Sequence, residues 1–143
     1  MNIRLMILSD YESVFSLWTN TAGMGMRSLD DSQSGIAKFL NRNPATNFIA
    51  EIDGKIAGVI LCGHDGRRGY IYHTAVNTDY RKQGIGKALV ETALYALRNE
   101  GINKVALVAF QTNDLGNAFW KALGFTERKD LVYRNFNLND ENL

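Results

Sequence analysis

The sequence predicts an α/β fold with a mixed, mostly antiparallel central sheet that helices cover. Three observations lead to this prediction. Strand-like and helix-like segments alternate along the 143 residues, Asp53-Gly54 forms a hairpin signature between two apolar segments, and an amphipathic segment precedes the apolar run 105–110. Hairpins join antiparallel strands, whereas a helical crossover joins parallel ones, so the sheet should contain both kinds of pair.

In the first half of the chain we expect strands at residues 3–8, 47–52 and 55–62 and helices after Ser9 and over residues 30–42. Ser9 and Glu12 have the capping-box spacing, and Val14, Leu17 and Trp18 then share one helix face. A turn over residues 64–69 separates the hairpin from a strand rich in β-branched and aromatic residues at 70–76.

In the second half, a glycine-marked loop leads into a helix that begins at Gly84. Its apolar residues recur at helical spacing, and Gly101 stands where a C′ glycine belongs. A buried strand over 104–110, a helix over 114–123 and one or two strands over 125–136 complete the expected order. No repeat or linker interrupts the chain, so we expect a single domain over residues 1–143.

Composition excludes several classes of protein. The 16 Lys and Arg residues against 15 Asp and Glu residues give a net charge of +1, which argues against a general nucleic-acid binder or an electrostatic membrane anchor. One cysteine and two histidines are too few for the usual Cys/His zinc site, so no metal is expected. No apolar run approaches the ~18 residues of a transmembrane helix. The lone Cys62 and the absence of a signal-peptide pattern predict a cytoplasmic protein.

The densest motif is AVNTDYRKQGIGKAL, residues 75–89, in which a strand ends, a basic glycine-rich loop follows and a helix begins. The first amides of a helix lack internal partners and attract anions, and Gly84 and Gly86 would let a phosphate approach the backbone. Two other phosphate motifs fail, since positions 81, 88 and 89 lack the residues that a P-loop or a GxGxxG motif needs. The alternative is an ordinary helix start without a ligand.

The context favours a ligand. Arg81-x-x-Gly84-x-Gly86 between such a strand and an amphipathic helix resembles the acetyl-CoA loop of the GNAT acetyltransferase superfamily. Asn113, followed by the aromatic and Gly-Phe pattern of residues 119–125, resembles that family's Asn…Tyr-x-x-x-Gly-Phe segment. The element order also matches, so the resemblance covers nearly the whole chain. It implies a GNAT-type fold.

Residues 64–76 add a resemblance to a bacterial branch related to the ribosomal-protein alanine acetyltransferases. The family resemblance implies acetyl-CoA as cosubstrate, with its pyrophosphate on the loop amides and its pantetheine arm along the preceding strand. The residues that match these positions are Thr74, Ala75, Val76, Arg81, Lys82, Gln83, Gly84, Ile85, Gly86 and Lys87, and Asn113 matches a position near the reactive end. The implied reaction is direct attack of a primary amine on the thioester in a ternary complex.

Two positions depart from the family pattern. Trp120 replaces the tyrosine acid, and Val108 replaces a glutamate base and is expected in the core. Tyr72, which shares a strand face with Tyr70, is our candidate catalytic residue, although a half-buried packing role fits it equally. Histidine in general has an intrinsic pKa that suits a base, but His73 should face the opposite side of the strand, toward helix packing, unless a β-bulge changes that facing.

These departures keep other functions open. A non-catalytic acyl-CoA-binding sensor or partner subunit is the main alternative to an N-acetyltransferase, and a nucleotide-phosphate binder is a weaker one. The acceptor could be a protein N-terminus, a lysine or a small amine, and the sequence identifies none of them. A homodimer through exposed strands near the C-terminus is also compatible with the pattern.

Overall fold

The computed structural model describes residues 1–143 and contains one five-stranded sheet in the order β1-β2-β3-β4-β5. The strands are β1 (Asn2–Leu5), β2 (Phe48–Ile52), β3 (Lys55–His64), β4 (Gly69–Val76) and β5 (Val105–Ala106). The first three neighbouring pairs are antiparallel and the β4–β5 pair is parallel. The prediction of a mixed, mostly antiparallel sheet is therefore confirmed.

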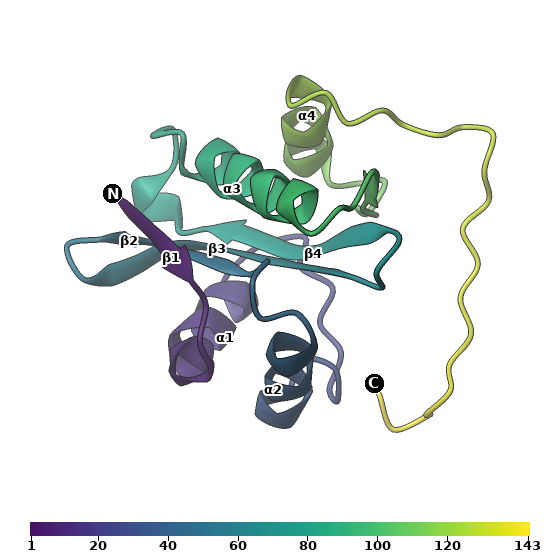
Figure 1. Cartoon of the computed structure of the whole chain (residues 1–143), viewed down its shortest axis with the longest axis horizontal. Helices are drawn as coiled ribbons and strands as arrows, with labels where there is room; N and C mark the ends of the chain where they lie inside the picture. Colours follow the sequence, from purple (N-terminus) through teal and green to yellow (C-terminus); the bar gives the residue numbers. More distant parts are fainter.

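Helices cover both faces of this sheet (Figure 1). α1 (Tyr11–Thr19) and α2 (Gln33–Arg42) lie against one face, whereas α3 (Ile85–Asn99) and α4 (Asp114–Ala122) lie on the other. Short 3-10 turns at Leu8–Asp10 and Thr78–Tyr80 precede α1 and follow β4. No helix in the structure is both long and apolar enough to cross a membrane.

Two apolar cores result, one on each face. Trp18, Ile36 and Val59 belong to the core under α1 and α2, while Ile60 and Leu89 belong to the core under α3. Each of these side chains is almost completely removed from solvent. The neighbours Val59 and Ile60 serve opposite cores because successive side chains of a strand alternate between the faces.

The start of α1 differs from the prediction. Ser9 and Glu12 do not form the expected capping box. Asp10 instead accepts a hydrogen bond from the Ile7 N–H at 2.9 Å and forms an ion pair with Arg4 at 2.7 Å. Burial by itself would raise the pKa of Asp10, but the bonds from Arg4 and Ile7 outweigh it and hold the pKa below its ordinary value. The arginine on β1 therefore decides which carboxylate closes this turn.

β4 contains a register shift that matters for the site. Ile60 is paired with Thr74 and Cys62 with Ile71, so Tyr72 and His73 together lie opposite Leu61. This two-against-one arrangement is a β-bulge. Ile71 packs into the α3 core and Ala75 into the α1 core, although they are four residues apart, because the bulge shifts the alternation by one residue.

The C-terminal part differs most from the prediction. The strand expected over 104–110 is limited to Val105–Ala106, and the strands expected over 125–136 do not form. Residues 126–138 form an extended tail that makes no backbone–backbone hydrogen bond within the chain. The tail leaves α4, passes outside the body and returns near α2 (Figure 1). A strand needs a neighbouring strand to accept and donate its backbone hydrogen bonds, and no segment of the chain does this for residues 126–138.

Candidate active site

The edge of β4 next to β5 opens immediately after the two strands meet. β5 pairs only with Gly69 and Tyr70, and no backbone hydrogen bond joins residues 71–76 to the segment that follows β5. Thr74, Ala75 and Val76 remain paired with β3 on their other edge. The open side of β4 therefore presents unpaired backbone groups to an extended ligand, as in strand addition.

The loop after β4 ends in a row of free amides. None of the backbone N–H groups of residues 82–87, namely Lys82, Gln83, Gly84, Ile85, Gly86 and Lys87, donates a hydrogen bond within the chain. Gly84 is the N-cap of α3 with no side-chain cap, and its φ of 77° lies in the left-handed region that favours glycine. Free amides at a helix N-terminus are groups that can bind an anion.

Positive charge surrounds these amides. Arg81 folds back so that its Nε donates to the Val76 carbonyl at 3.4 Å, and Lys87 lies 3.9 Å from Glu91 in an exposed pair. Gly86 has a second role, because a Cβ there would stand 3.1 Å from the ring of Phe119 on α4. The second glycine thus permits the close approach of α3 and α4.

Asn113, which is predicted to lie near the reactive end of the cosubstrate, stands at the start of α4. It is the N-cap of α4, and its Oδ1 accepts the Gly116 N–H at 3.0 Å. Its amide group also packs against Gly23 in the loop between α1 and α2, where an added Cβ would come within 2.9 Å of Nδ2. Asn113 therefore joins the end of the open sheet edge to the loop on the opposite face.

Tyr72 lies on the α2 side of β4 with about half of its surface exposed. Its ring packs edge-on against Phe39 at 5.4 Å and lies 4.6 Å from Tyr70, centroid to centroid. Burial raises the pKa of the Tyr72 phenol, and the negative charge of Asp30 raises it further. The phenol is thus protonated at neutral pH and can donate a hydrogen bond but cannot act as a base.

A cavity of about 490 Å³ adjoins Tyr72 on this face. Phe39, Tyr70 and Tyr72 provide its aromatic wall, and Arg42, Arg68 and Lys104 bring three cations to it. None of these cations has an acidic partner within ion-pair distance. Asp65 also lines the cavity, so its wall combines aromatic, cationic and acidic side chains.

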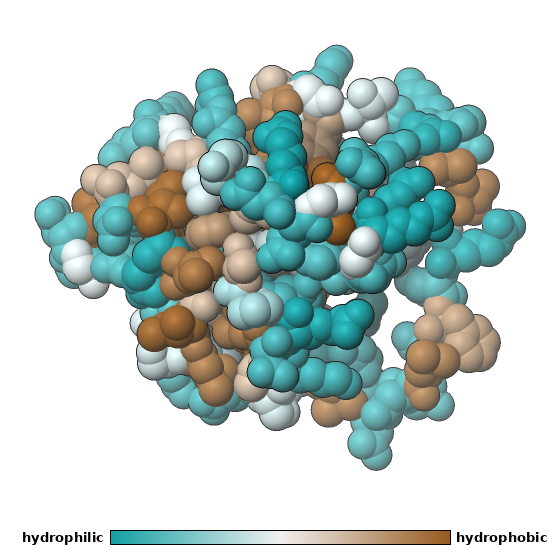
Figure 2. Space-filling view, in the orientation of Figure 1, coloured by the Kyte–Doolittle hydropathy of each residue, from teal (hydrophilic) through white to brown (hydrophobic).

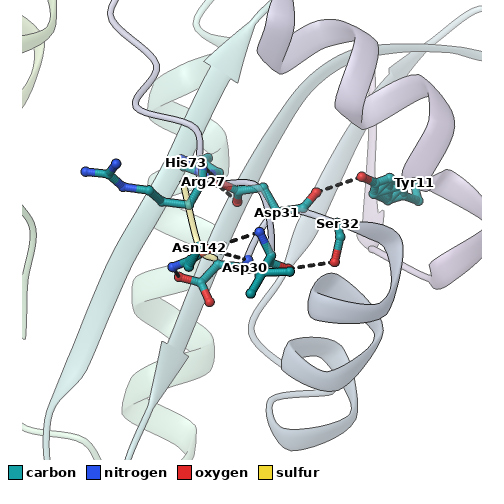
Figure 3. Close-up of polar contacts among 8 residues, drawn as sticks. Tyr11, Arg27, Asp30, Asp31, Ser32, His73 and Asn142 are labelled. Carbon is teal, nitrogen blue, oxygen red and sulfur yellow. Dashed lines mark hydrogen bonds and ion pairs between the residues drawn. The ribbon is translucent and has the colours of Figure 1, made fainter. Parts of the chain in front are cut away.

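The facing predicted for His73 is wrong, because the bulge turns His73 to the same side of the sheet as Tyr72. Its Nε2 lies 2.7 Å from Oδ1 of Asp31, and its ring meets the edge of Trp18 at 4.8 Å between centroids (Figure 3). Helix packing was expected for His73, but the carboxylate was not. Asp31 is 42 residues away in sequence, and no motif marked it as a partner.

The two positions that depart from the family pattern have distinct surroundings. Trp120 packs between Phe119 and Phe125, with both centroid distances at 5.0 Å. Val108 was expected in the core but is 56% exposed, because the predicted strand 104–110 stops at Ala106. Neither residue can serve as an acid or a base.

Comparison with known proteins gives the class of this chain. The model of the acetyltransferase (GNAT) family matches residues 11–125. An acetyltransferase of Pectobacterium atrosepticum is 33% identical over 114 residues, which cover 80% of this chain and 79% of that protein. An acetyltransferase of Sodalis glossinidius is 33% identical over 132 residues, with coverages of 92% and 91%.

Solved structures share the fold. A ribosomal-protein-alanine N-acetyltransferase from Brucella melitensis has a TM-score of 0.69 at 20% identity, covering 96% of this chain and 99% of that one. A chain of the NatC complex bound to Gag peptide and CoA has a TM-score of 0.73 at 23% identity, covering 90% and 86%. The protein belongs to the GNAT family and is an N-acetyltransferase by class. The Brucella melitensis enzyme shows that a ribosomal-protein-alanine N-acetyltransferase has this fold too.

Proposed function

We propose that the protein transfers the acetyl group of acetyl-CoA to a primary amine within a ternary complex. This proposal rests on the row of free amides over residues 82–87, which follows the open edge of β4. The amides suit a pyrophosphate, and the edge at Thr74, Ala75 and Val76 suits the pantetheine amides. The related fold of a complex bound to CoA supports the same cosubstrate.

The acceptor would approach from the opposite side, where Tyr72 and the adjoining cavity lie. The amine nitrogen attacks the thioester carbon, the C–N bond forms and the C–S bond breaks. A strand amide near Val76 stabilises the developing oxyanion, and the CoA sulfur leaves with a proton. A thiol pKa of about 8.5 makes that last protonation undemanding.

A pair of glycine variants tests the cofactor site. Gly84→Glu places a carboxylate and a side chain over the free amides, so CoA and acetyl-CoA should no longer raise the melting temperature. Gly101→Glu is the matched control, because Gly101 has a φ of 78°, open space around its Cβ position and a place at the other end of α3. Equal CoA shifts in both variants would remove the loop assignment.

The class of ligand is tested with the unmodified protein. At 100 times the dissociation constant, CoA or acetyl-CoA should stabilise the folded protein by about 2.7 kcal/mol and so raise its melting temperature. ATP and NAD should leave the melting temperature unchanged. An alanine-terminated peptide, a blocked lysine peptide and spermidine then serve as probe acceptors. CoA binding without transfer to any of these amines would instead favour the non-catalytic sensor.

Tyr72 is proposed as a hydrogen-bond donor near the reacting atoms. Tyr72→Phe should lower kcat by about tenfold, the loss of one hydrogen bond of roughly 1.4 kcal/mol, with unchanged affinity for CoA. Tyr95→Phe, at an exposed position on α3, is the control. Normal turnover of Tyr72→Phe would leave this residue a packing role against Phe39.

We also propose that two copies associate through the tail of residues 126–138. The tail has no backbone partner, and Leu131, Val132, Tyr133, Phe136 and Leu138 are each at least 60% exposed. Figure 2 shows apolar side chains along the tail, separated from the body by a gap. Light scattering should give a dimer mass for the protein and a monomer mass for Leu131→Asp, with Asn137→Asp as the control. A monomeric parent protein would contradict this.

A further inference from the structure

We propose that His73, oriented by Asp31, is the base that accepts the proton of the acceptor amine. This inference rests on the proposed acetyl transfer, and it supplies the proton route that Val108 and Trp120 cannot provide. An alkyl ammonium has no lone pair, so it must lose a proton before it attacks a thioester. Among the side chains next to the open end of β4, His73 is the one whose imidazole ring can take up a proton from a bound amine and release it again.

The β-bulge places His73 where this role requires it. Tyr72 and His73 share the space opposite Leu61, so both reach the α1 and α2 side of the sheet. Thr74, the next residue, begins the segment that runs along the open edge. His73 is therefore one residue from the backbone proposed to hold the cosubstrate, and it faces the side of the sheet proposed for the acceptor.

Asp31 is held rigidly for its part. One carboxylate oxygen, Oδ2, accepts the Arg27 N–H at 2.6 Å, and the other, Oδ1, meets His73. The Asp31 carbonyl accepts the hydroxyl of Tyr11 at 2.7 Å, and its N–H donates to the Arg27 carbonyl at 3.0 Å. These bonds come from α1, β4 and the loop itself, as Figure 3 shows. The carboxylate therefore has a fixed position from which to orient the imidazole.

The tautomer follows from this contact. An ionised carboxylate only accepts hydrogen bonds, so Nε2 of His73 carries the proton that Asp31 accepts, and Nδ1 keeps its lone pair. Nδ1 has no hydrogen-bond partner in the chain, yet it is not among the polar atoms sealed from solvent. A carboxylate that orients one ring nitrogen while the other takes a proton is the arrangement of a general base.

The charges around His73 are few. Asp31 is its only ionic contact, Asp30 points to Asn142 with a 2.9 Å hydrogen bond, and the Arg27 guanidinium extends away from Asp31 without an ion pair (Figure 3). From α1, Trp18 presents an aromatic edge, and the Tyr11 hydroxyl donates to the Asp31 carbonyl. The single carboxylate therefore stabilises the imidazolium that forms when Nδ1 takes the proton.

The attacking nitrogen loses two protons in the proposed reaction. Nδ1 of His73 takes one proton from R–NH₃⁺ and later releases it to solvent. The free amine attacks the carbonyl carbon, the C–N bond forms, and the C–S bond breaks with its electron pair on sulfur. The second proton on the attacking nitrogen passes to the CoA thiolate. The products are the amide R–NH–CO–CH₃, CoA-SH and one proton.

A pH profile tests this role. The kcat/KM for the probe acceptors named above should fall on the acid side as one group is protonated. His73→Gln should lower kcat by about a hundredfold and remove that acid limb, with an unchanged melting-temperature shift for CoA. Asp31→Asn should lower kcat by at least tenfold, because the imidazole loses its orienting anion. Tyr95→Phe, at the exposed position on α3, is again the control, because the other histidine, His64, lines the cavity proposed for the acceptor.

A second measurement does not depend on variants that fold. Side-chain ¹⁵N spectra of a protein with two histidines should show His73 as the Nε2–H tautomer at neutral pH. An Nδ1–H tautomer, or a His73→Gln enzyme that keeps its acid limb, would overturn the inference alone. Failure of the unmodified protein to acetylate any probe amine would overturn the proposed function and this inference with it.

Discussion

The chain divides into two regions that pack very differently. Every buried residue lies between Met6 and Ile102, whereas residues 103–143 contain none. Both regions contain apolar runs of strand length, at 56–62 in the first and at 105–110 in the second. The first run lies in β3, which is covered on both faces of the sheet. In the second run, only Val105–Ala106 forms a strand. An apolar pattern gives a buried strand only where neighbouring elements cover both faces and supply ladder partners.

The largest expected effect contrasts two leucines across this division. Leu89→Ala empties a site at the centre of the α3 core and should lower the free energy of unfolding by about 2–5 kcal/mol. Leu131→Ala, in the tail, should change it by less than about 0.5 kcal/mol at protein concentrations that keep one copy apart from another. Urea unfolding measures both. Similar losses would show that the tail packs as tightly as the core.

The next effect contrasts two ion pairs and their response to pH. Asp10→Asn removes the carboxylate that Arg4 and the Ile7 N–H share, leaves Arg4 paired with Glu51 alone, and should cost about 1.5–3 kcal/mol at pH 7. The pKa of Asp10 is lowered in the folded state, so its contribution is complete above its ordinary pKa and disappears as the pH falls through the lower, folded value. The two proteins should therefore converge in acid.

The control for that variant is an ion pair in the tail. Arg128 and Asp130 form a pair at 2.8 Å that is fully open to solvent, so Asp130→Asn should not change the urea midpoint measurably at any pH. A loss at neutral pH as large as that of Asp10→Asn would contradict the division of the chain into a packed and an exposed region.

The smallest effect concerns a contact between the C-terminal residues and the loop before α2. Oδ1 of Asn142 accepts the amides of Leu29 and Asp30 at 3.0 and 3.1 Å. Asn142→Ala should speed hydrogen exchange at these two amides by an amount equivalent to about 0.5–1.5 kcal/mol and leave the global stability nearly unchanged. Asn137→Ala, in the exposed tail, is the control. Unchanged exchange would mean that the tail does not hold this loop.

Local chemistry made the packed region largely predictable. Asp53-Gly54 marked the first hairpin, and Gly101 marked the end of α3 with a φ of 78°. Asp65 closes the second turn, as expected, by accepting the amides of Arg67 and Arg68. In each case one residue determines the local backbone, so the pattern is visible within a few positions.

The remaining features depend on contacts between distant segments. The bulge at Tyr72 and His73 follows from how β4 pairs with β3, and strand periodicity alone gives the opposite facing for His73. Asp31 becomes its partner only when the loop before α2 lies against β4. The open tail was missed for a related reason, because its apolar pattern is that of a strand, whereas no segment of the chain forms a ladder with it.

The tail is attached to the body of the protein at both ends. It leaves α4 at Phe125, and at its far end the Ser28 N–H donates to the Leu143 carbonyl at 2.8 Å while Asn142 holds Leu29 and Asp30. Asp31 is the next residue along that loop. A partner that binds the tail would therefore act on the loop that holds Asp31 against His73. By thermodynamic reciprocity, if a partner on the tail changes the affinity of the acceptor site by some factor, an occupied acceptor site changes the affinity of the tail for that partner by the same factor.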